Sequence, residues 1–208
     1  FTCPNWWYNQ IGVPRQLYRI MLLAEDSLTP RQMQAGIRIL ERARLGMTGQ
    51  NLVWVAEVTI ARGCLAQDPM VVWEAFRRME SEIRVTTGEG IQPDWSFYQH
   101  GPQLYSGGYG RGFSQDCPYF ASLAHGTHFA FADEKIEILG HYLLDGQQWM
   151  TRWQRFDYSA CGREISRRRA ANARGLAAAC RHMMAVHPER RDEYKAFADR
   201  LDAGFSPD

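Results

Sequence analysis

The sequence has few cysteines and no long apolar segment. Its five cysteines are widely scattered and include no CxxC pair, so neither a zinc knuckle nor a dense disulfide framework is indicated. The longest apolar runs, LVWVA and IMLLA, are far shorter than the roughly 20 residues that span a bilayer. A membrane-spanning protein is therefore not expected.

An excess of charge of either sign is also lacking. The 24 basic and 23 acidic residues leave a net charge of +1, so no global field favours nucleic acid or a membrane surface as the partner. A length of 208 residues with 45% hydrophobic side chains suits one globular domain or a large part of one. Because the chain opens at Phe1 with residues typical of a domain interior, we expect a part of a longer chain.

Helical patterns dominate the sequence. Thr29 followed by Pro30 is a helix start, and apolar residues recur at helical spacing from there to about Arg44. Similar patterns cover 15–25, 51–66, 69–85, 133–150, 171–186 and 188–202. Only RFDYSA at 155–160 resembles a strand. The sequence therefore predicts an all-α fold of antiparallel helical hairpins, arranged as a bundle or a ring.

Two long stretches, 86–115 and 151–169, lack a helical pattern but are rich in Trp, Tyr, His and Arg, which is typical of functional loops. In the first, His100 and Tyr109 are separated by GPQLYSGG, and the glycines allow the imidazole and the phenol to converge. A buried histidine and an unrelated packed tyrosine are the alternative interpretation.

The second stretch contains CGREISRRR. If this segment is helical, Arg163 and Arg167 lie on one face, where two guanidinium groups can hold carboxylates or sulfates. Arg168 and Arg169 are interpreted as solvent-exposed basic residues. In TGQN, the ordinary interpretation of Asn51 is an N-cap, since a helix begins there.

Trp6 and Trp7 stand side by side in NWWYNQIG. Neighbouring tryptophans cannot both face one core from a regular helix, so at least one is expected to be exposed or at the wall of a cleft. Flat indole faces at a cleft suit sugar rings. Core packing of one of the two remains the alternative.

Four segments, NWWYNQIGVPRQL, TGQN, DWSFYQHGPQLYSGGYG and GREISR, resemble in this order the signature segments of polysaccharide lyase family 8, which contains hyaluronate, chondroitin AC and xanthan lyases. The resemblance implies an incomplete (α/α) toroid whose cleft binds an acidic polysaccharide and cuts it by β-elimination beside a uronic acid. It implies that 1–208 is part of one catalytic domain, with further N-terminal helices and C-terminal β-sandwich domains outside this sequence.

The resemblance also implies roles for single residues. Asn51 and His100 match the pair that neutralises the uronate carboxylate, Tyr109 the residue that transfers protons, and Arg163 the arginine beside that tyrosine. An amide and an imidazole can stabilise the enediolate that forms when C5 loses its proton. A nearby guanidinium favours the phenolate that takes this proton, and the phenol can return it to the leaving oxygen.

Arg167 matches a substrate-contacting arginine, while Trp6 and Trp7 match the aromatic patch of the family. The resemblance implies no cofactor and a secreted or periplasmic protein. Chondroitin or hyaluronan is the first expectation for the substrate, and xanthan or another uronate polymer is the alternative. The patterns HYLLD and HGTHF are weak as metal sites and are more simply explained as helix and core residues.

Two other functions are weighed against the lyase. A non-catalytic sugar-binding helical domain would keep the aromatic patch without turnover. A glycoside hydrolase on a helical toroid needs two facing carboxylates, and the loops offer only Asp94, Asp116 and Asp157, without a convincing pair. The hydrolase is ranked last.

Overall fold

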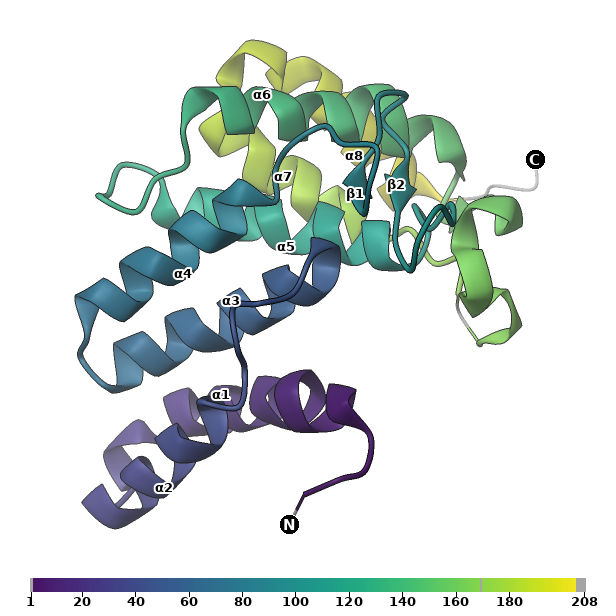
Figure 1. Cartoon of the computed structure of the whole chain (residues 1–208). Coiled ribbons are helices and arrows are strands. Elements are labelled where there is room, and N and C mark those ends of the chain that lie inside the picture. The colour runs from purple at the N-terminus through teal and green to yellow at the C-terminus, as the bar shows by residue number, and fades with distance from the viewer. Residues whose placement is uncertain (1, 169, 205–208) are drawn as a thin grey trace. The chain divides into compact units, whose positions relative to one another are not determined.

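The computed structural model describes residues 2–168 and 170–204, which belong to two compact units. The N-terminal unit runs from Phe1 to Glu82, and the C-terminal unit runs from Ile83 to Asp208. Both units are built mainly of helices, and the described residues contain only two small hairpins of strands (Figure 1). The all-α class predicted from the sequence is confirmed.

The N-terminal unit is a series of helices joined by short turns, drawn in purple to blue in Figure 1. A π-helical turn, Tyr8–Gly12, leads directly into the first α-helix. The α-helices are α1 (Val13–Leu23), α2 (Pro30–Leu40), α3 (Gly49–Leu65) and α4 (Pro69–Ser81), with a 3-10 turn at Glu25–Ser27. Helices α3 and α4 pack closely along each other, and α1 and α2 both contact α3.

Local capping explains where two of these helices start. Thr29 accepts a hydrogen bond from the backbone N–H of Gln32, and the Gln32 side chain accepts one in return from the Thr29 N–H. This reciprocal pair satisfies two N–H groups that the first turn leaves without partners. Asp68 caps α4 by accepting from the N–H groups of Met70 and Val71 at 3.0 and 3.2 Å. The helix start predicted at Thr29 is confirmed.

The core of the N-terminal unit surrounds α3, which is buried along most of its length. Its buried apolar side chains are Ile11, Met21, Leu40, Ala43, Leu52, Val55, Val58 and Leu65. Full burial of one leucine or valine stabilises the fold by about 1.5–3 kcal/mol relative to its exposure. This apolar set accounts for much of the stability of the unit.

The carboxylate of Glu57 is buried within this helical core. Glu57 on α3 is 4% exposed and pairs with the guanidinium groups of Arg15 at 2.8 Å and Arg19 at 3.0 Å. The hydroxyl of Tyr18 donates to the same carboxylate, and burial together with that carboxylate raises the pKa of Tyr18 to about 12. A buried carboxylate is tolerated only with such partners, so Glu57 ties α1 to α3.

The C-terminal unit mixes helices with the two hairpins. The strands are β1 (Gly90–Ile91) paired antiparallel with β2 (Phe97–Tyr98), and β3 (Thr151–Arg152) paired antiparallel with β4 (Arg155–Phe156). The α-helices are α5 (Tyr109–Ala124), α6 (Asp133–His141), α7 (Leu176–Val186) and α8 (Arg191–Ala203). Shorter helical turns occupy Tyr142–Gly146, Gln147–Met150, Tyr158–Ser166 and Pro188–Arg190.

Buried aromatic side chains fix the first hairpin against the start of α5. The rings of Phe97 on β2 and Phe113 on α5 lie 5.1 Å apart, and both contact the ring of Tyr142. The Tyr142 hydroxyl is buried and donates to the carbonyl oxygen of Gly110 at 2.9 Å. Helix α7 packs on both α5 and α8, which completes the core behind the hairpin.

The prediction that residues 86–115 form a loop is wrong in its second part, because α5 begins at Tyr109. Three glycines, Gly108, Gly110 and Gly112, hid this helix, since glycine weakens a helix by about 1 kcal/mol relative to alanine. Tertiary packing overrides the propensity here. A Cβ at Gly110 would lie 2.7 Å from both Phe97 Cβ and the Tyr142 hydroxyl oxygen. Gly110 therefore lowers the helix propensity of this segment but allows α5 to pack closely against Phe97 and Tyr142.

The region 151–169 is also more ordered than a loop. The strand predicted at 155–160 is present only at Arg155–Phe156. After Asp157, the chain forms a 3-10 turn, Tyr158–Ser166, which is kinked at Gly162. The helix predicted from residue 171 starts at Leu176, after a segment of turns that is hydrogen-bonded to the second hairpin. The helix predicted over 133–150 is α6 followed by a π-helical and a 3-10 turn.

Candidate functional site

A carboxylate holds the turn that carries His100. Glu89 accepts hydrogen bonds from the backbone N–H groups of His100 at 2.7 Å and Gly101 at 3.3 Å, and from the side-chain amide of Gln99 at 2.5 Å. His100 has a φ of 60°, a left-handed conformation that non-glycine residues adopt rarely and at a cost. Such a backbone persists only where its surroundings determine it, and these conformations concentrate at functional sites.

The imidazole of His100 meets two tyrosine rings. Its centroid lies 4.9 Å from the Tyr109 ring in an edge-to-face arrangement, and the Tyr105 ring lies 4.9 Å from the Tyr109 ring on another side. Tyr109 is 8% exposed and Tyr105 is fully buried. The structure therefore brings the predicted imidazole and phenol together, at the first residue of α5.

Close backbone approach makes this meeting possible. A Cβ at Gly108 would lie 2.2 Å from Cε1 of Tyr105, a distance that no side chain tolerates. The N–H groups of Gly108 and Gly110 both donate to the carbonyl oxygen of Tyr105 at 3.0 Å. The chain thus folds tightly around the Tyr105 ring and turns directly into α5, which fixes the direction of the Tyr109 phenol.

Arg163 reaches the same place from the kinked 3-10 turn. Gly162 before it has φ 55° and ψ −142°, and a Cβ there would lie 2.7 Å from the Tyr105 ring. Nη2 of Arg163 is 3.1 Å from Nε2 of His100. Because a guanidinium can only donate, Nε2 accepts, and a neutral His100 then carries its proton on Nδ1.

Burial and two charges of opposite sign determine the pKa of His100. Burial lowers the pKa of His100, and the positive charge of Arg163 lowers it further, while the Glu89 carboxylate opposes both. Hydrogen bonding to the Tyr105 hydroxyl, and then to the Tyr109 hydroxyl, raises the pKa of Arg163. The site is therefore a neutral imidazole and a phenol beside a permanent cation.

A second carboxylate, Glu164, lies next to this cluster. Its Oε1 is 3.1 Å from Nη1 of Arg167, and its Oε2 is 3.9 Å from Nη2 of Arg111. Arg111 also donates to the carbonyl oxygens of Ala170 and Asn172 at 2.8 and 3.2 Å. Glu164 therefore pairs with two other arginines close to Arg163. The guanidinium of Arg163 instead contacts His100, Tyr105 and Tyr109.

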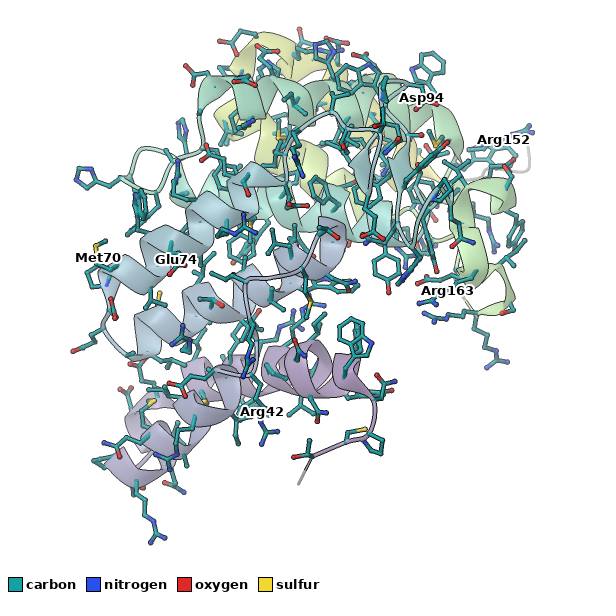
Figure 2. The ribbon with its side chains drawn as sticks, viewed as in Figure 1. Arg42, Met70, Glu74, Asp94, Arg152 and Arg163 are labelled. Carbon is teal, nitrogen blue, oxygen red and sulfur yellow. The ribbon has the colours of Figure 1, made fainter. Side chains whose placement is uncertain are left out.

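The expectation that Arg163 and Arg167 share one helix face is wrong. Arg167 follows the 3-10 turn with extended backbone angles, because the turn ends at Ser166. Its side chain is 62% exposed and lines a neighbouring cavity. Arg168 is exposed, as interpreted from the sequence, and Arg169 lies outside the described residues. In Figure 2, Arg163 and Arg152 both project from the side of the unit that carries the second hairpin.

Asn51 is not an N-cap. Helix α3 starts at Gly49 after Thr48, so Asn51 is inside its first turn. Gly49 takes a left-handed conformation with φ 56°, and its N–H donates to the Glu82 carboxylate at 2.6 Å. The side chain of Asn51 is 8% exposed, and its Oδ1 has no hydrogen-bond partner among the residues described.

The two neighbouring tryptophans, Trp6 and Trp7, differ in their surroundings. Trp6 is 49% exposed, whereas Trp7 is partly buried and packs edge-to-face against Tyr8 at 5.4 Å and Trp54 at 6.0 Å. The expectation that one of the pair is exposed is confirmed. Trp7 also lines a largely apolar cavity of about 490 Å³ together with Tyr8, Gly12, Val13, Arg15, Gln16, Leu17 and Ile20.

The predicted site residues are divided between the two units. His100, Tyr109 and Arg163 form one contact cluster in the C-terminal unit, with Arg167 at its edge. Asn51 and the tryptophan pair belong to the N-terminal unit, where each is held by its own helix. The cluster of three is therefore the candidate active site that the geometry defines.

Sequence reasoning missed Glu89 and Tyr105, although both shape the cluster. Glu89 stands in GEGIQPD, where its glycine neighbours suggested a turn and nothing indicated that its carboxylate would bind the backbone of His100. Tyr105 lies in the quoted LYSGGYG segment, and the glycines that follow it were the available signal. Glycines after an aromatic residue can mark a backbone that wraps around that ring.

Other kinds of site were sought in the part of the chain that the structure describes. No group of three or more His, Cys, Asp or Glu side chains there could hold a metal ion. All five cysteines are free thiols. None of the helices described is both long and apolar enough to span a membrane.

Comparison with known proteins supplies the context of the cluster. Chondroitinase-AC from Pedobacter heparinus is 29% identical over 168 residues, which cover 78% of this chain and 24% of that enzyme. Xanthan lyase from a Bacillus species, strain GL1, is 26% identical over 168 residues and is covered to 18%. Hyaluronate lyase from Thermasporomyces composti is 29% identical over 141 residues. The chain thus spans about a fifth to a quarter of the length of these relatives.

Solved structures agree with the sequence relatives. A chondroitinase AC lyase solved with oligosaccharides has a TM-score of 0.87 at 25% identity, and the match covers 99% of this chain and 31% of that one. The chondroitin AC lyase of Streptomyces coelicolor A3, solved with chondroitin sulphate, has a TM-score of 0.83 at 22% identity over 98% of this chain and 34% of that one. Residues 2–199 match the family described as "Polysaccharide lyase family 8, N terminal alpha-helical domain". The chain belongs to polysaccharide lyase family 8 and corresponds to its N-terminal α-helical domain.

Proposed function

We propose that the chain carries the proton-transfer residues of a lyase that cleaves a uronate-containing polysaccharide by β-elimination. The observation that supports this most is the contact between the Tyr109 phenol, the His100 imidazole and the Arg163 guanidinium. Relatives named as chondroitinase, xanthan lyase and hyaluronate lyase support the same reaction class. The remaining domains of a longer chain would complete the enzyme.

In this proposal Tyr109 removes the proton from C5 of the uronate. The electrons of the C5–H bond form a C4=C5 double bond while the C4–O4 bond breaks, and the phenol returns a proton to the leaving O4. The Arg163 guanidinium stabilises negative charge on the phenol oxygen during the transfer. The kinked turn at Gly162 keeps that guanidinium beside the tyrosine before substrate binds.

The carboxylate of the uronate has to be neutralised before C5 becomes acidic enough to lose a proton. A neutral His100 accepts from Arg163 at Nε2 and has Nδ1–H free to donate to the carboxylate. Asn51 is proposed as the second donor, through the N–H of its side-chain amide. Removing one such donor costs about 10²–10³ in rate.

The substrate is proposed to be chondroitin or hyaluronan, with xanthan as the alternative. Polymers of this size are degraded outside the cytoplasm, so we propose a secreted or periplasmic enzyme. Trp6 and Trp7 would stack on the sugar chain from the N-terminal unit. Trp6→Ala should then raise KM for long chains more than it lowers kcat, because stacking stabilises the ground and transition states alike.

The test is Tyr109→Phe in the whole protein, with unsaturated product followed by ultraviolet absorbance on a panel of chondroitin, hyaluronan and xanthan. The variant should lose all measurable turnover and keep binding, since phenylalanine preserves the ring and lacks the transferable proton. Tyr119→Phe is the matched control, because Tyr119 is an exposed tyrosine on the same helix. Residual elimination by Tyr109→Phe would contradict the proposed base, and polymer binding without product by the wild type would instead assign a non-catalytic sugar-binding domain.

A further inference from the structure

The C-terminal unit contains a cavity that the proposed reaction does not use. It has a volume of about 410 Å³ and lies between the second hairpin and the segment that precedes α7. Its walls are formed by Gln154, Arg155, Tyr158, Arg167, Ala170, Ala171, Asn172 and Arg174. Three of these described residues are arginines and none is acidic, in a chain whose net charge is only +1.

The walls of the cavity are held by backbone hydrogen bonds. The N–H of Phe156 donates to the carbonyl oxygen of Ala171 at 2.7 Å, and the N–H of Ala173 donates to that of Gln154 at 2.8 Å. Arg111 on α5 donates to two carbonyls of the same segment, at Ala170 and Asn172. The segment is therefore attached on both sides, and the cavity exists before any ligand arrives.

Two of the three arginines, Arg155 and Arg174, have no carboxylate partner among the described residues. The guanidinium of Arg155 makes no hydrogen bond or ion pair with any described residue, and that of Arg174 donates through Nε to the neutral Gln154 amide at 2.6 Å. Gln154 is itself fixed, because its amide donates to the carbonyl oxygen of Leu201 at 2.8 Å. Arg167 has one carboxylate partner, Glu164, and its side chain is 62% exposed.

Three guanidinium groups around one concave space repel one another unless an anion lies between them. Guanidinium groups bind sulfate and carboxylate oxygens in a planar, two-pronged geometry. The volume fits an anionic group together with part of the sugar ring that bears it. Tyr158 and Asn172 add a hydroxyl and an amide at the wall, which are suitable partners for sugar hydroxyls.

We propose that this cavity is a second binding site for an oxyanion group, a sulfate ester or a uronate carboxylate, on the polysaccharide chain. The inference rests on the proposed function for the identity of the polymer. Arg155 and Arg174 are the residues that define it, because neither touches His100, Tyr109 or Arg163. The site would hold a sugar unit other than the one that is cleaved and would favour highly charged polymers.

The test measures binding of hexasaccharides to the whole chain by titration calorimetry, without turnover. Arg155→Gln with Arg174→Gln should weaken binding about a hundredfold, since each change removes one hydrogen-bonding contact between a guanidinium and the anionic group. Arg155→Gln alone should weaken it about tenfold, and that change breaks no side-chain hydrogen bond or ion pair between described residues. Arg31→Gln with Arg191→Gln is the control, because it removes the same charge from two exposed positions and should change affinity less than twofold.

Chondroitin sulfate and unsulfated chondroitin hexasaccharides are compared to identify the anionic group. A loss with the sulfated sugar alone assigns a sulfate ester, and a loss with both assigns the uronate. Unchanged binding by the double variant, an equal loss in the control variant, or a wild type that binds inorganic sulfate but no hexasaccharide would each overturn the proposal. Persistent elimination by Tyr109→Phe would contradict only the proposed base, since the calorimetry does not depend on turnover.

Discussion

The two units are stabilised in different ways. The N-terminal unit relies on regular helices around the buried α3, and the buried carboxylate of Glu57 has three partners. The part of the C-terminal unit that carries the candidate active site relies on irregular backbone, with left-handed His100 and kinked Gly162 held by a few specific contacts. Substitutions in the core of the N-terminal unit should therefore mainly lower the free energy of unfolding. Substitutions in the irregular backbone of the C-terminal unit should mainly change the positions of the side chains at the candidate active site.

The largest effect is expected in the core of the N-terminal unit. Leu52 is fully buried, so Leu52→Ala should lower the free energy of unfolding by about 2–5 kcal/mol. Urea unfolding followed by circular dichroism measures this loss. Leu23→Ala is the control, because Leu23 is 91% exposed and its truncation should change the stability by about 0.5 kcal/mol or less. Similar losses in the two variants would show that α3 is not the centre of the unit.

A smaller effect on stability, with a specific effect on the site, is expected at Gly108. Gly108→Ala places a methyl group against the Tyr105 ring and should cost about 1–3 kcal/mol. The ring contact between Tyr105 and Tyr109 should change as well, which tyrosine NMR signals would report. Gly46→Ala is the matched control, because a Cβ there meets no atom within 4 Å. Equal tolerance of the two changes would contradict the packing described for Gly108.

Removing the Glu89 charge should loosen one turn without unfolding the protein. Glu89→Gln weakens the hydrogen bonds to the N–H groups of His100 and Gly101, and hydrogen exchange of these two amides should become faster. The pKa of His100 should fall further, because the Glu89 carboxylate is the contribution that raises it. Glu134→Gln, at an exposed position on α6, should change neither quantity. A rise in the pKa of His100 in Glu89→Gln would refute this assignment.

The smallest effect is expected in the dependence of folding stability on pH. Since burial and Arg163 lower the pKa of His100 in the folded state, the unfolded chain binds the proton more readily. Stability contributed by His100 is therefore lost as the pH falls below about 6.5 and through the folded-state pKa, and is present above 6.5. Wild type and His100→Gln compared in thermal unfolding across this range should isolate the contribution. Arg163→Gln should raise the pKa of His100, and no change in an NMR titration would argue against their contact.

The sequence predicted the regular part of this molecule better than the irregular part, for physical reasons. The start at Thr29 depends on local chemistry, and the structure has that cap. Helix α5 was missed because its glycines serve contacts with residues far away in the chain, such as Phe97 and Tyr142. Local patterns cannot reveal such contacts.

The same distinction applies to the site. Glycines between His100 and Tyr109 predicted that these residues could converge, and in the structure their ring centroids lie 4.9 Å apart. The capping interpretation of Asn51 failed because Gly49, in a left-handed conformation, starts the helix earlier. The Glu89 contact could not be foreseen, since it depends on how two turns meet in space. The roles of the predicted residues in catalysis stay predictions until the variants above are measured.

The glycines around Tyr105 have a consequence for protein engineering. Gly107 lies against Cys161, and Gly108 and Gly162 lie against the ring of Tyr105, at distances that leave no room for a methyl group. Copying only the side chains of Tyr109, His100 and Arg163 onto another helical scaffold would therefore not reproduce their arrangement. The smallest transferable module therefore includes the Tyr105 ring and the glycine backbone wrapped around it, and substitutions that randomise these glycines would disrupt the packing around that ring.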